Sequence, residues 1–185
     1  MVVGCAADTN ILPDSGDSNT GGGSATAVIC GKSGLYIDLN FSEDIAAISD
    51  CTRLLGTLRV GDSPFVSIDG LESIDTIDEM VVLFRNPALA SLQGLSGLAW
   101  VGDAIHVRFN SNLPNLTGFE SLVQAGSLLI EYNDVLTNLD GLQSLQTVAG
   151  DLIIVGNPLL SQTEAESFAN GVAVGGTIRI EGNGS

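Results

Sequence analysis

The chain has 185 residues, and its acidic residues outnumber its basic residues by 22 to 6, for a formal net charge of -16. A surface this acidic repels the phosphates of nucleic acids and of anionic lipid headgroups, so the sequence excludes both as expected ligands. No stretch reaches the roughly 18 consecutive apolar residues of a membrane span. Only 5% of the residues are aromatic, so Leu, Ile and Val must build the core.

Residues 1–29 are rich in Gly, Ser, Asp, Asn and Thr and show no apolar periodicity. Such a segment buries too little apolar surface to offset the entropy cost of ordering it, so we predict a disordered N-terminal tether. The stretch DSGDSN (14–19) does not fit a calcium loop, because its glycine falls too early and no Glu follows at the twelfth position.

The start of the tether, Val2-Val3-Gly4-Cys5, resembles the lipobox of bacterial lipoproteins. In that family the cysteine becomes the lipidated N-terminus of the mature protein, so the resemblance implies a lipid on Cys5. Only four residues precede Cys5, whereas a secretory signal has a basic start and roughly 7–15 apolar residues. The resemblance therefore implies a trimmed start, and the alternative is a chance match.

From residue 58 onwards the sequence repeats with a period in the twenties. The marker is an aspartate in the first repeat and an asparagine in the five that follow, with steps of 24, 24, 23, 24 and 26 residues: Asp62, Asn86, Asn110, Asn133, Asn157 and Asn183. A glycine followed by Leu or Phe keeps the same phase: Gly70, Gly94, Gly118 and Gly141. Such a period predicts a solenoid in which each repeat stacks on the one before it.

Within each repeat, apolar residues alternate as in a strand. The positions predicted to point inward are Leu58/Val60, Val81/Leu83, Ile105/Val107, Leu128/Ile130, Leu152/Ile154 and Ile178/Ile180. A second apolar set follows each corner, and the glycine before each strand is expected to permit a tight turn. The predicted fold is mostly β, a right-handed parallel β-solenoid of about six coils over residues 30–185.

The repeated asparagine has a structural explanation at each corner. The backbone leaves the ladder there, and its N–H and C=O groups need new partners. Asparagine tolerates a left-handed backbone, and its amide can both donate and accept hydrogen bonds. We therefore expect Asn86, Asn110, Asn133, Asn157 and Asn183 to form a structural column that bonds from one repeat to the next.

The stretch QTEAESFANGV (162–172) interrupts the repeat. It contains good helix formers, and Thr163 with Glu166 fits a capping box, so we predict a short C-terminal helix that covers the last repeat. At the other end, Cys30 and Cys51 flank the start of the repeats. They fit either a disulfide in an oxidising compartment or two buried free thiols.

ISDCTRLLGTLRV (48–60) and GTIRIEGN (176–183) resemble the opening and closing segments of receptor L domains, the ligand-binding modules of insulin- and EGF-receptor ectodomains. The resemblance covers about residues 30–183. It implies that Cys30 and Cys51 form a disulfide. The regular repeats are most similar to the bacterial secreted and lipoprotein versions of the family, and the absence of a cysteine-rich neighbour departs from the receptor versions.

The sequence offers no constellation for catalysis, so we do not expect an enzyme. Its one histidine, His106, is predicted to point outward as a surface residue, and no G-x-S-x-G nucleophile motif occurs. Cysteine and histidine are too few for a transition-metal site, and we expect no cofactor. One acidic group, Asp69, Glu72, Asp75, Asp78 and Glu79, fits either a solvated corner or a calcium site, and the solvated corner is preferred.

The outward strand positions suggest a binding surface. They combine apolar residues with three arginines: Arg59, Val82, Phe84, His106, Arg108, Leu129, Ile153, Val155 and Arg179. An apolar patch among arginines suits docking of a protein or glycan. Two alternatives remain: the N-terminal segment or another chain covers this face, or β-branched residues stand there because they suit strands.

Together these patterns predict a binding or adhesion module outside the cytoplasm. The expected location is a bacterial cell surface, an outer membrane reached through a lipid on Cys5, or the secreted fraction. The rival hypothesis is a structural envelope or matrix component with no discrete ligand.

Overall fold

The structure is a computed structural model that describes residues 27–185. The chain is mostly β, with 32% strand and 11% helix, and twelve strands form one sheet in which every pairing is parallel. The strands are β1 (Ile29–Cys30), β2 (Tyr36–Asp38), β3 (Arg53–Leu54), β4 (Thr57–Gly61), β5 (Thr76–Ile77), β6 (Val81–Phe84), β7 (Trp100–Arg108), β8 (Gln124–Glu131), β9 (Thr147–Val148), β10 (Leu152–Val155), β11 (Ala173–Val174) and β12 (Ile178–Glu181). The helices are α1 (Ser42–Ala46), the single 3₁₀ turn η1 (Gln93–Leu95) and α2 (Gln162–Gly171).

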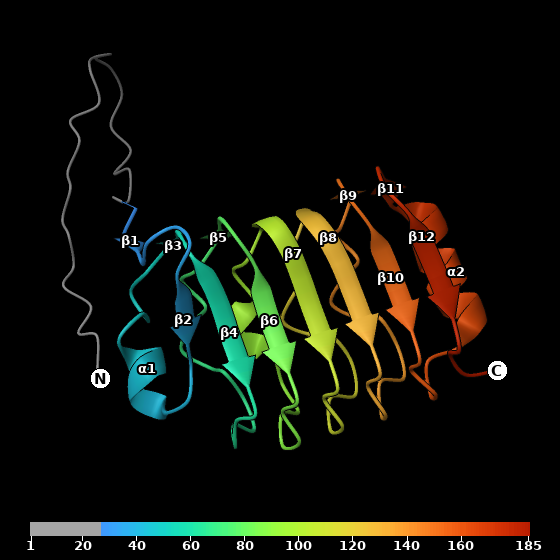
Figure 1. The fold of residues 1–185 in the computed structure, drawn as a ribbon, viewed down its shortest axis with the longest axis horizontal. Coiled ribbons are helices and arrows are strands. Elements are labelled where there is room, and N and C mark those ends of the chain that lie inside the picture. Colours follow the sequence, from blue (N-terminus) through green and yellow to red (C-terminus); the bar gives the residue numbers. More distant parts are fainter. Residues whose placement is uncertain (1–26) are drawn as a thin grey trace, which may run out of the picture.

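The strands pair repeat by repeat in two ladders (Figure 1). The main ladder runs β2, β4, β6, the second halves of β7 and β8, then β10 and β12. The short ladder runs β1, β3, β5, the first halves of β7 and β8, then β9 and β11. The main ladder has one strand more than the six that the sequence predicts, because β2 pairs with β4 although β2 lacks the asparagine marker.

The predicted inward alternation is confirmed in β4, β6, β7, β8 and β10. The ten predicted inward residues of these strands are at most 1% exposed, and the pairing register stacks each on its counterpart in the next repeat. The second apolar set, such as Leu136 and Leu142, is also buried. The last repeat differs: Ile178 is 52% exposed, because no further strand covers it.

The asparagine column bonds from repeat to repeat, as predicted. Asn86, Asn110, Asn133 and Asn157 are fully buried. In each, the side-chain Nδ2 donates to a main-chain carbonyl of the preceding strand at 2.9–3.0 Å. Each Oδ1 accepts the backbone N–H of the residue one place earlier in the column. The column therefore satisfies polar groups that the corners would otherwise leave buried and unpaired.

Two details of that prediction were wrong. Ser63, rather than the marker residue Asp62, takes the first place in the column, because Leu58 pairs with Val81 and Val60 with Leu83 as predicted, and the Ser63 N–H donates to Asn86 Oδ1 at 3.2 Å. The left-handed residue is also not the asparagine but the residue before it. At the position before each member of the column, φ is positive: Asp62 (51°), Arg85 (55°), Phe109 (57°), Tyr132 (54°), Gly156 (70°) and Gly182 (65°).

The glycines before the strands are required for a reason other than the predicted tight turn. Gly126 and Gly150 do not have a positive φ, so they are not required by a turn conformation. A Cβ on Gly126 would instead collide with the carbonyl oxygen of Asp103, and one on Gly150 would lie 2.5 Å from Ser127 Oγ. These glycines let successive repeats approach closely, which a larger residue would prevent.

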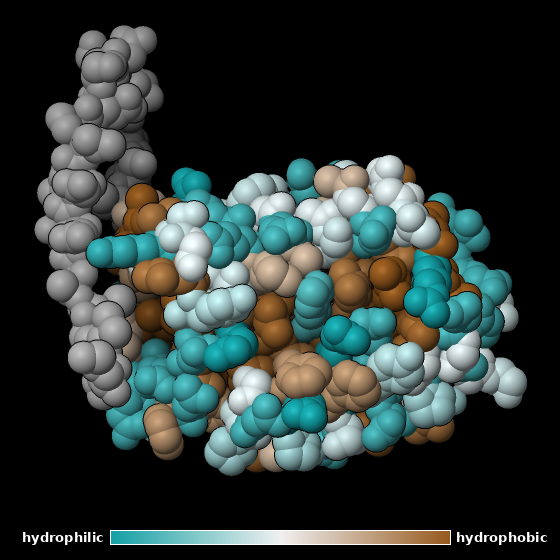
Figure 2. Space-filling view, in the orientation of Figure 1, coloured by the Kyte–Doolittle hydropathy of each residue, from teal (hydrophilic) through white to brown (hydrophobic). Residues whose placement is uncertain are grey.

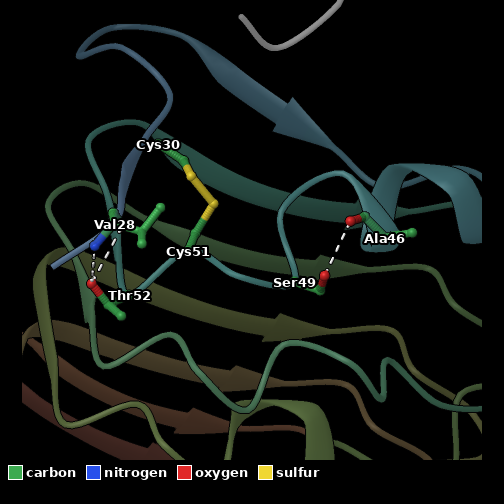
Figure 3. The surroundings of a disulfide bond; sticks show 6 residues. All are labelled: Val28, Cys30, Ala46, Ser49, Cys51 and Thr52. Atoms are coloured by element: carbon green, nitrogen blue, oxygen red, sulfur yellow. Dashed lines mark hydrogen bonds between the residues drawn. A yellow bond between two sulfur atoms is a disulfide. The ribbon is translucent and has the colours of Figure 1, made fainter. Parts of the chain in front are cut away.

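Cys30 and Cys51 form a disulfide with a Cα–Cα distance of 5.9 Å (Figure 3). The bond joins the end of β1 to the residues that lead into β3, and beside it the Val28 N–H donates to Thr52 Oγ1 at 3.0 Å. Val28 and Ile29, at the end of the predicted tether, are thus attached to the sheet. The rest of the tether, including Cys5, lies outside the described residues.

Helix α2 forms where the sequence predicts it, but it begins differently. Its N-cap is Ser161, so the proposed capping box of Thr163 and Glu166 is wrong, and no side chain caps the helix. Glu164 instead accepts the Leu139 N–H at 3.1 Å, and Glu166 accepts a hydrogen bond from Gln162. The helix packs on β11 and β12 but leaves Ile178 exposed, so it does not close the end of the sheet.

Candidate functional site

The candidate residues on the outward strand face lie in two rows across the main ladder. The strand register aligns the first row as Arg59, Val82, His106, Leu129, Ile153 and Arg179. It aligns the second row as Phe84, Arg108, Glu131, Val155 and Glu181. The structure therefore brings all nine predicted binding residues onto one face, in the order that their repeats dictate.

This face is less apolar at its surface than the sequence suggests. Only Arg59 and Arg179, at its two ends, are exposed, and Val155 is buried at 6% exposure. The other predicted residues are half-buried, and Figure 2 shows teal and brown residues interleaved across this side of the molecule. Leu129 and Ile153, which are paired neighbours on this face, are therefore only partly exposed.

Each arginine of the face has an acidic partner. Arg59 is held by both carboxylate oxygens of Asp38, and Arg179 by Glu181. Arg108 Nε lies 2.7 Å from Glu131 Oε2, although neither atom is aligned for a hydrogen bond. These partners neutralise the cations that the sequence suggested for ligand contact.

His106 is half-buried between the arginine pairs rather than fully at the surface. Burial lowers the pKa of its imidazole, and the nearby charge of Arg108 lowers this pKa further. Glu131 and Asp103 act in the opposite direction but less strongly. The imidazole is therefore neutral at pH 7 and adds no positive charge to the face.

This side also carries a row of aromatic residues, of which the sequence analysis named only Phe84. Phe84, Phe109 and Tyr132, which we call the aromatic strip, come from successive repeats at the carboxyl ends of their strands. Phe109 and Tyr132 are 42% and 43% exposed. Arg85 lies over the Phe84 ring at 5.1 Å, and Arg108 lies 5.7 Å from the Phe109 ring centre.

Phe109 and Tyr132 have left-handed backbones, which are unfavourable for bulky residues by about 1–2 kcal/mol each. The later repeats place Gly156 and Gly182 at the same position, where the conformation is free of this cost. The chain therefore retains exposed aromatic side chains where glycine would stabilise the backbone. Local strain of this kind is typical of functional positions. Their place immediately before Asn110 and Asn133 is the signal in the sequence that could have found them.

Neighbouring residues cover most of the ring faces of the aromatic strip. Phe109 and Tyr132 stack with ring centres 5.1 Å apart and planes within 9°. Phe84 meets Phe109 edge to face at 5.7 Å, and the other side of Tyr132 lies over Gly156. The strip thus presents ring edges rather than faces to solvent, which leaves little open π surface for a stacked sugar.

The acidic group proposed at the corner is divided among local contacts. Asp78 holds Arg53, Glu72 accepts the Gly70 N–H, and Asp69 accepts the Ser67 hydroxyl. Glu79 accepts hydrogen bonds from Ser33 and Thr57, among others. Within residues 27–185, no group of three or more His, Cys, Asp or Glu side chains is arranged to hold a metal ion.

Among the residues that the structure describes, no helix is long and apolar enough to cross a membrane. The Cys30–Cys51 bond is compatible with a protein outside the cytoplasm. No protein-family model, curated protein or solved structure matches the chain.

Proposed function

We propose that the chain is a non-enzymatic binding module that docks a protein partner through the aromatic strip and the adjoining outward strand face. The observation that carries the proposal is the pair Phe109 and Tyr132, which are exposed and stacked on left-handed backbones. Aromatic side chains, with Arg85 and Arg108 beside them, are the residue types most enriched at protein–protein interfaces.

A protein is a better fit than a glycan for this surface. Sugars bind aromatic residues mainly through open ring faces, and here Phe109, Tyr132 and Gly156 cover one another. The exposed ring edges and the arginine stems instead suit apolar and carboxylate side chains of a polypeptide.

The proposed fold behind this surface is a right-handed parallel β-solenoid of the receptor L-domain kind. Two features support it: the parallel ladders that advance one strand per repeat, and the Cys30–Cys51 bond that the family implies. The proposed location is extracytoplasmic, on a bacterial surface or secreted, and a lipid on Cys5 would supply an anchor.

A structural component without a discrete ligand is the second candidate. It is supported by the neutralised arginines of the outward face and by the half-buried state of its apolar residues. The same stack of aromatic rings would then serve only to cover the corners.

The test compares the parent with Phe109→Gly/Tyr132→Gly in selections from a phage-displayed peptide library and on a glycan array. Glycine suits the left-handed backbone at both positions, so the variant is expected to fold with a similar thermal midpoint. Peptides selected on the parent should bind the double variant at least tenfold more weakly than they bind the parent, which corresponds to about 1.4 kcal/mol of binding free energy.

Phe41→Ala is the matched control, because Phe41 is an aromatic residue with 68% exposure outside the strip. It should leave peptide binding unchanged. Leu129→Asp then tests the centre of the outward face, where a charge should also weaken binding. Equal binding by the parent and the double variant would exclude the strip, glycan binding alone would exclude a protein ligand, and failure to select any binder would favour the structural role.

A further inference from the structure

The C-terminal end of the main ladder is open. Strand β12 pairs with β10 on one side only, and Ile178 is 52% exposed there (Figure 1). After Glu181 the chain turns back toward α2, where the Gly184 N–H donates to the Leu160 carbonyl at 2.7 Å and the Gly184 carbonyl accepts the Gln162 N–H. Among residues 27–185, no strand pairs with the other edge of β12.

The hydrogen-bonding groups of this edge can be assigned from the alternation of the strand. The carbonyls of Thr177 and Glu181 accept N–H groups from Leu152 and Gly156, so these residues face β10. Ile178 and Ile180, between them, must direct their N–H and C=O groups to the other edge, where the Ile180 carbonyl accepts a hydrogen bond from Gln162 Nε2 of α2 at 3.0 Å. No strand of residues 27–185 pairs with this edge, and a strand edge of this kind with apolar side chains is a template for another strand.

Apolar surface lies beside the same edge. Ile178 and Ile180 line a shallow hollow of about 350 Å³ together with Glu166, Ala169 and Asn170 of α2. Partial burial of Ile180 and exposure of Ile178 leave the last layer of the core in contact with solvent. A strand added at this edge would cover that layer.

We propose that this edge binds the same edge of a second copy of the chain, with the two β12 strands antiparallel about a two-fold axis at Ile180. In that register Ile180 faces its own copy and exchanges both main-chain hydrogen bonds, and the N–H of the copy replaces Gln162 Nε2 at each Ile180 carbonyl. Arg179 of each copy then lies directly opposite Glu181 of the other, on the outward face. The sequence Arg179-Ile180-Glu181 is therefore self-complementary in charge, as a two-fold interface requires.

The existing contact of Arg179 does not oppose this arrangement. Its pair with Glu181 of the same chain joins two side chains that are 55% and 56% exposed, and exposed pairs contribute little to stability. Exchanging that pair for two equivalent pairs between copies keeps every charge neutralised.

A head-to-tail contact between β12 and β2 of another copy is less favourable. Continuing the parallel register would place Asp38 beside Arg179, but Asp38 already binds Arg59 of its own chain with both oxygens. That contact would satisfy one charge pair rather than two, and it would not close at two copies.

The experiment is sedimentation velocity on the full chain over a concentration series. Every protein carries Cys5→Ser, so that an intermolecular disulfide cannot imitate the contact. The parent should form a dimer and no larger species. Arg179→Glu and Glu181→Arg should each weaken dimerisation at least about tenfold, because each places like charges opposite one another twice.

An equimolar mixture of Arg179→Glu and Glu181→Arg proteins should regain the dimer, because every acid then faces an arginine in the heterodimer. Lys32→Glu, which makes the same change in net charge as Arg179→Glu at the opposite end, should dimerise like the parent. Far-ultraviolet circular dichroism of each variant checks that the fold is kept.

Four results would overturn the proposal. They are a monomeric parent at all concentrations, single variants that dimerise like the parent, a mixture that stays monomeric, or species larger than a dimer in the parent. The last result, together with an unaffected Glu181→Arg protein, would favour the head-to-tail contact.

Discussion

Asn133 accepts two hydrogen bonds from Asn110 through one side-chain oxygen, at 3.0 Å from the backbone N–H and 3.3 Å from Nδ2. Its own Nδ2 donates to the Val107 carbonyl at 3.0 Å. Since the side chain is fully buried, removal of the amide takes this acceptor from the Asn110 N–H and this donor from the Val107 carbonyl, whereas Asn110 Nδ2 keeps the Leu83 carbonyl.

Asn133→Ala should therefore lower the free energy of unfolding by about 3 kcal/mol. Asn133→Asp should also be destabilising near pH 7, because a buried carboxylate cannot donate to Val107. Burial raises the pKa of such a carboxyl, so the deficit relative to the parent should shrink as the pH falls and the group becomes a neutral donor. Urea unfolding at several pH values measures both effects. Asn112→Ala, at an exposed asparagine, is the control, and a column variant as stable as this control would refute the role of the column.

Gly126→Ala tests the close approach of successive repeats. A methyl group there would collide with the Asp103 carbonyl, so the repeats must separate, at a cost of about 2 kcal/mol in unfolding free energy. Gly171→Ala is the matched control: a methyl group at this position would have no neighbour within 4 Å, and the residue ends α2, so the change should be neutral or slightly stabilising. Thermal unfolding of the two variants side by side decides whether space, rather than backbone freedom, requires Gly126.

The disulfide should stabilise the first repeats. Cys30 and Cys51 are 21 residues apart, and in the chain-entropy model a loop of this length contributes about 3 kcal/mol. Cys30→Ala/Cys51→Ala should lose about this amount in urea unfolding under non-reducing conditions. Cys5→Ser should change nothing, and equal stability of all three proteins would show that the bond is dispensable.

Glu79 should make the loop before β2 sensitive to acid. The hydrogen bond from the Gly34 N–H is the largest cause that lowers the pKa of the Glu79 carboxyl, and the Ser33 hydroxyl adds to it. Because the folded-state pKa is lowered, the stabilisation is complete above the unfolded-state value of about 4.3 and is lost as the pH falls through the folded-state pKa.

Amide hydrogen exchange at Gly34, measured from pH 6 downwards and corrected for intrinsic rates, should accelerate in the parent below about pH 4.3. Glu79→Gln keeps an acceptor but removes the titrating group, so its protection should not depend on pH in this range. Asp134→Asn, at an exposed acid, should behave like the parent. The same acid dependence in Glu79→Gln would assign the effect to another group.

The sequence by itself determined the six strands that precede the repeated marker, their inward ladder and the asparagine column. These features follow from short-range alternation and from a spacing of 23–26 residues, which are visible without knowing how strands align. It also located α2 and placed Cys30 and Cys51 at the same end of the repeats. The residues alone did not decide whether the two thiols are free or form a disulfide.

Only the tertiary structure decided how neighbouring repeats meet. The register of β4 on β6 gives the first place of the column to Ser63, and the register of β7 on β8 pairs Arg108 with Glu131 and brings Phe109 and Tyr132 together as a stack. Strand register is set by packing across the whole ladder, so residues about 24 apart in the sequence become partners only when the strands align. For that reason the sequence pointed to the outward face, whereas the aromatic strip and the open edge of β12 became visible only in the folded chain.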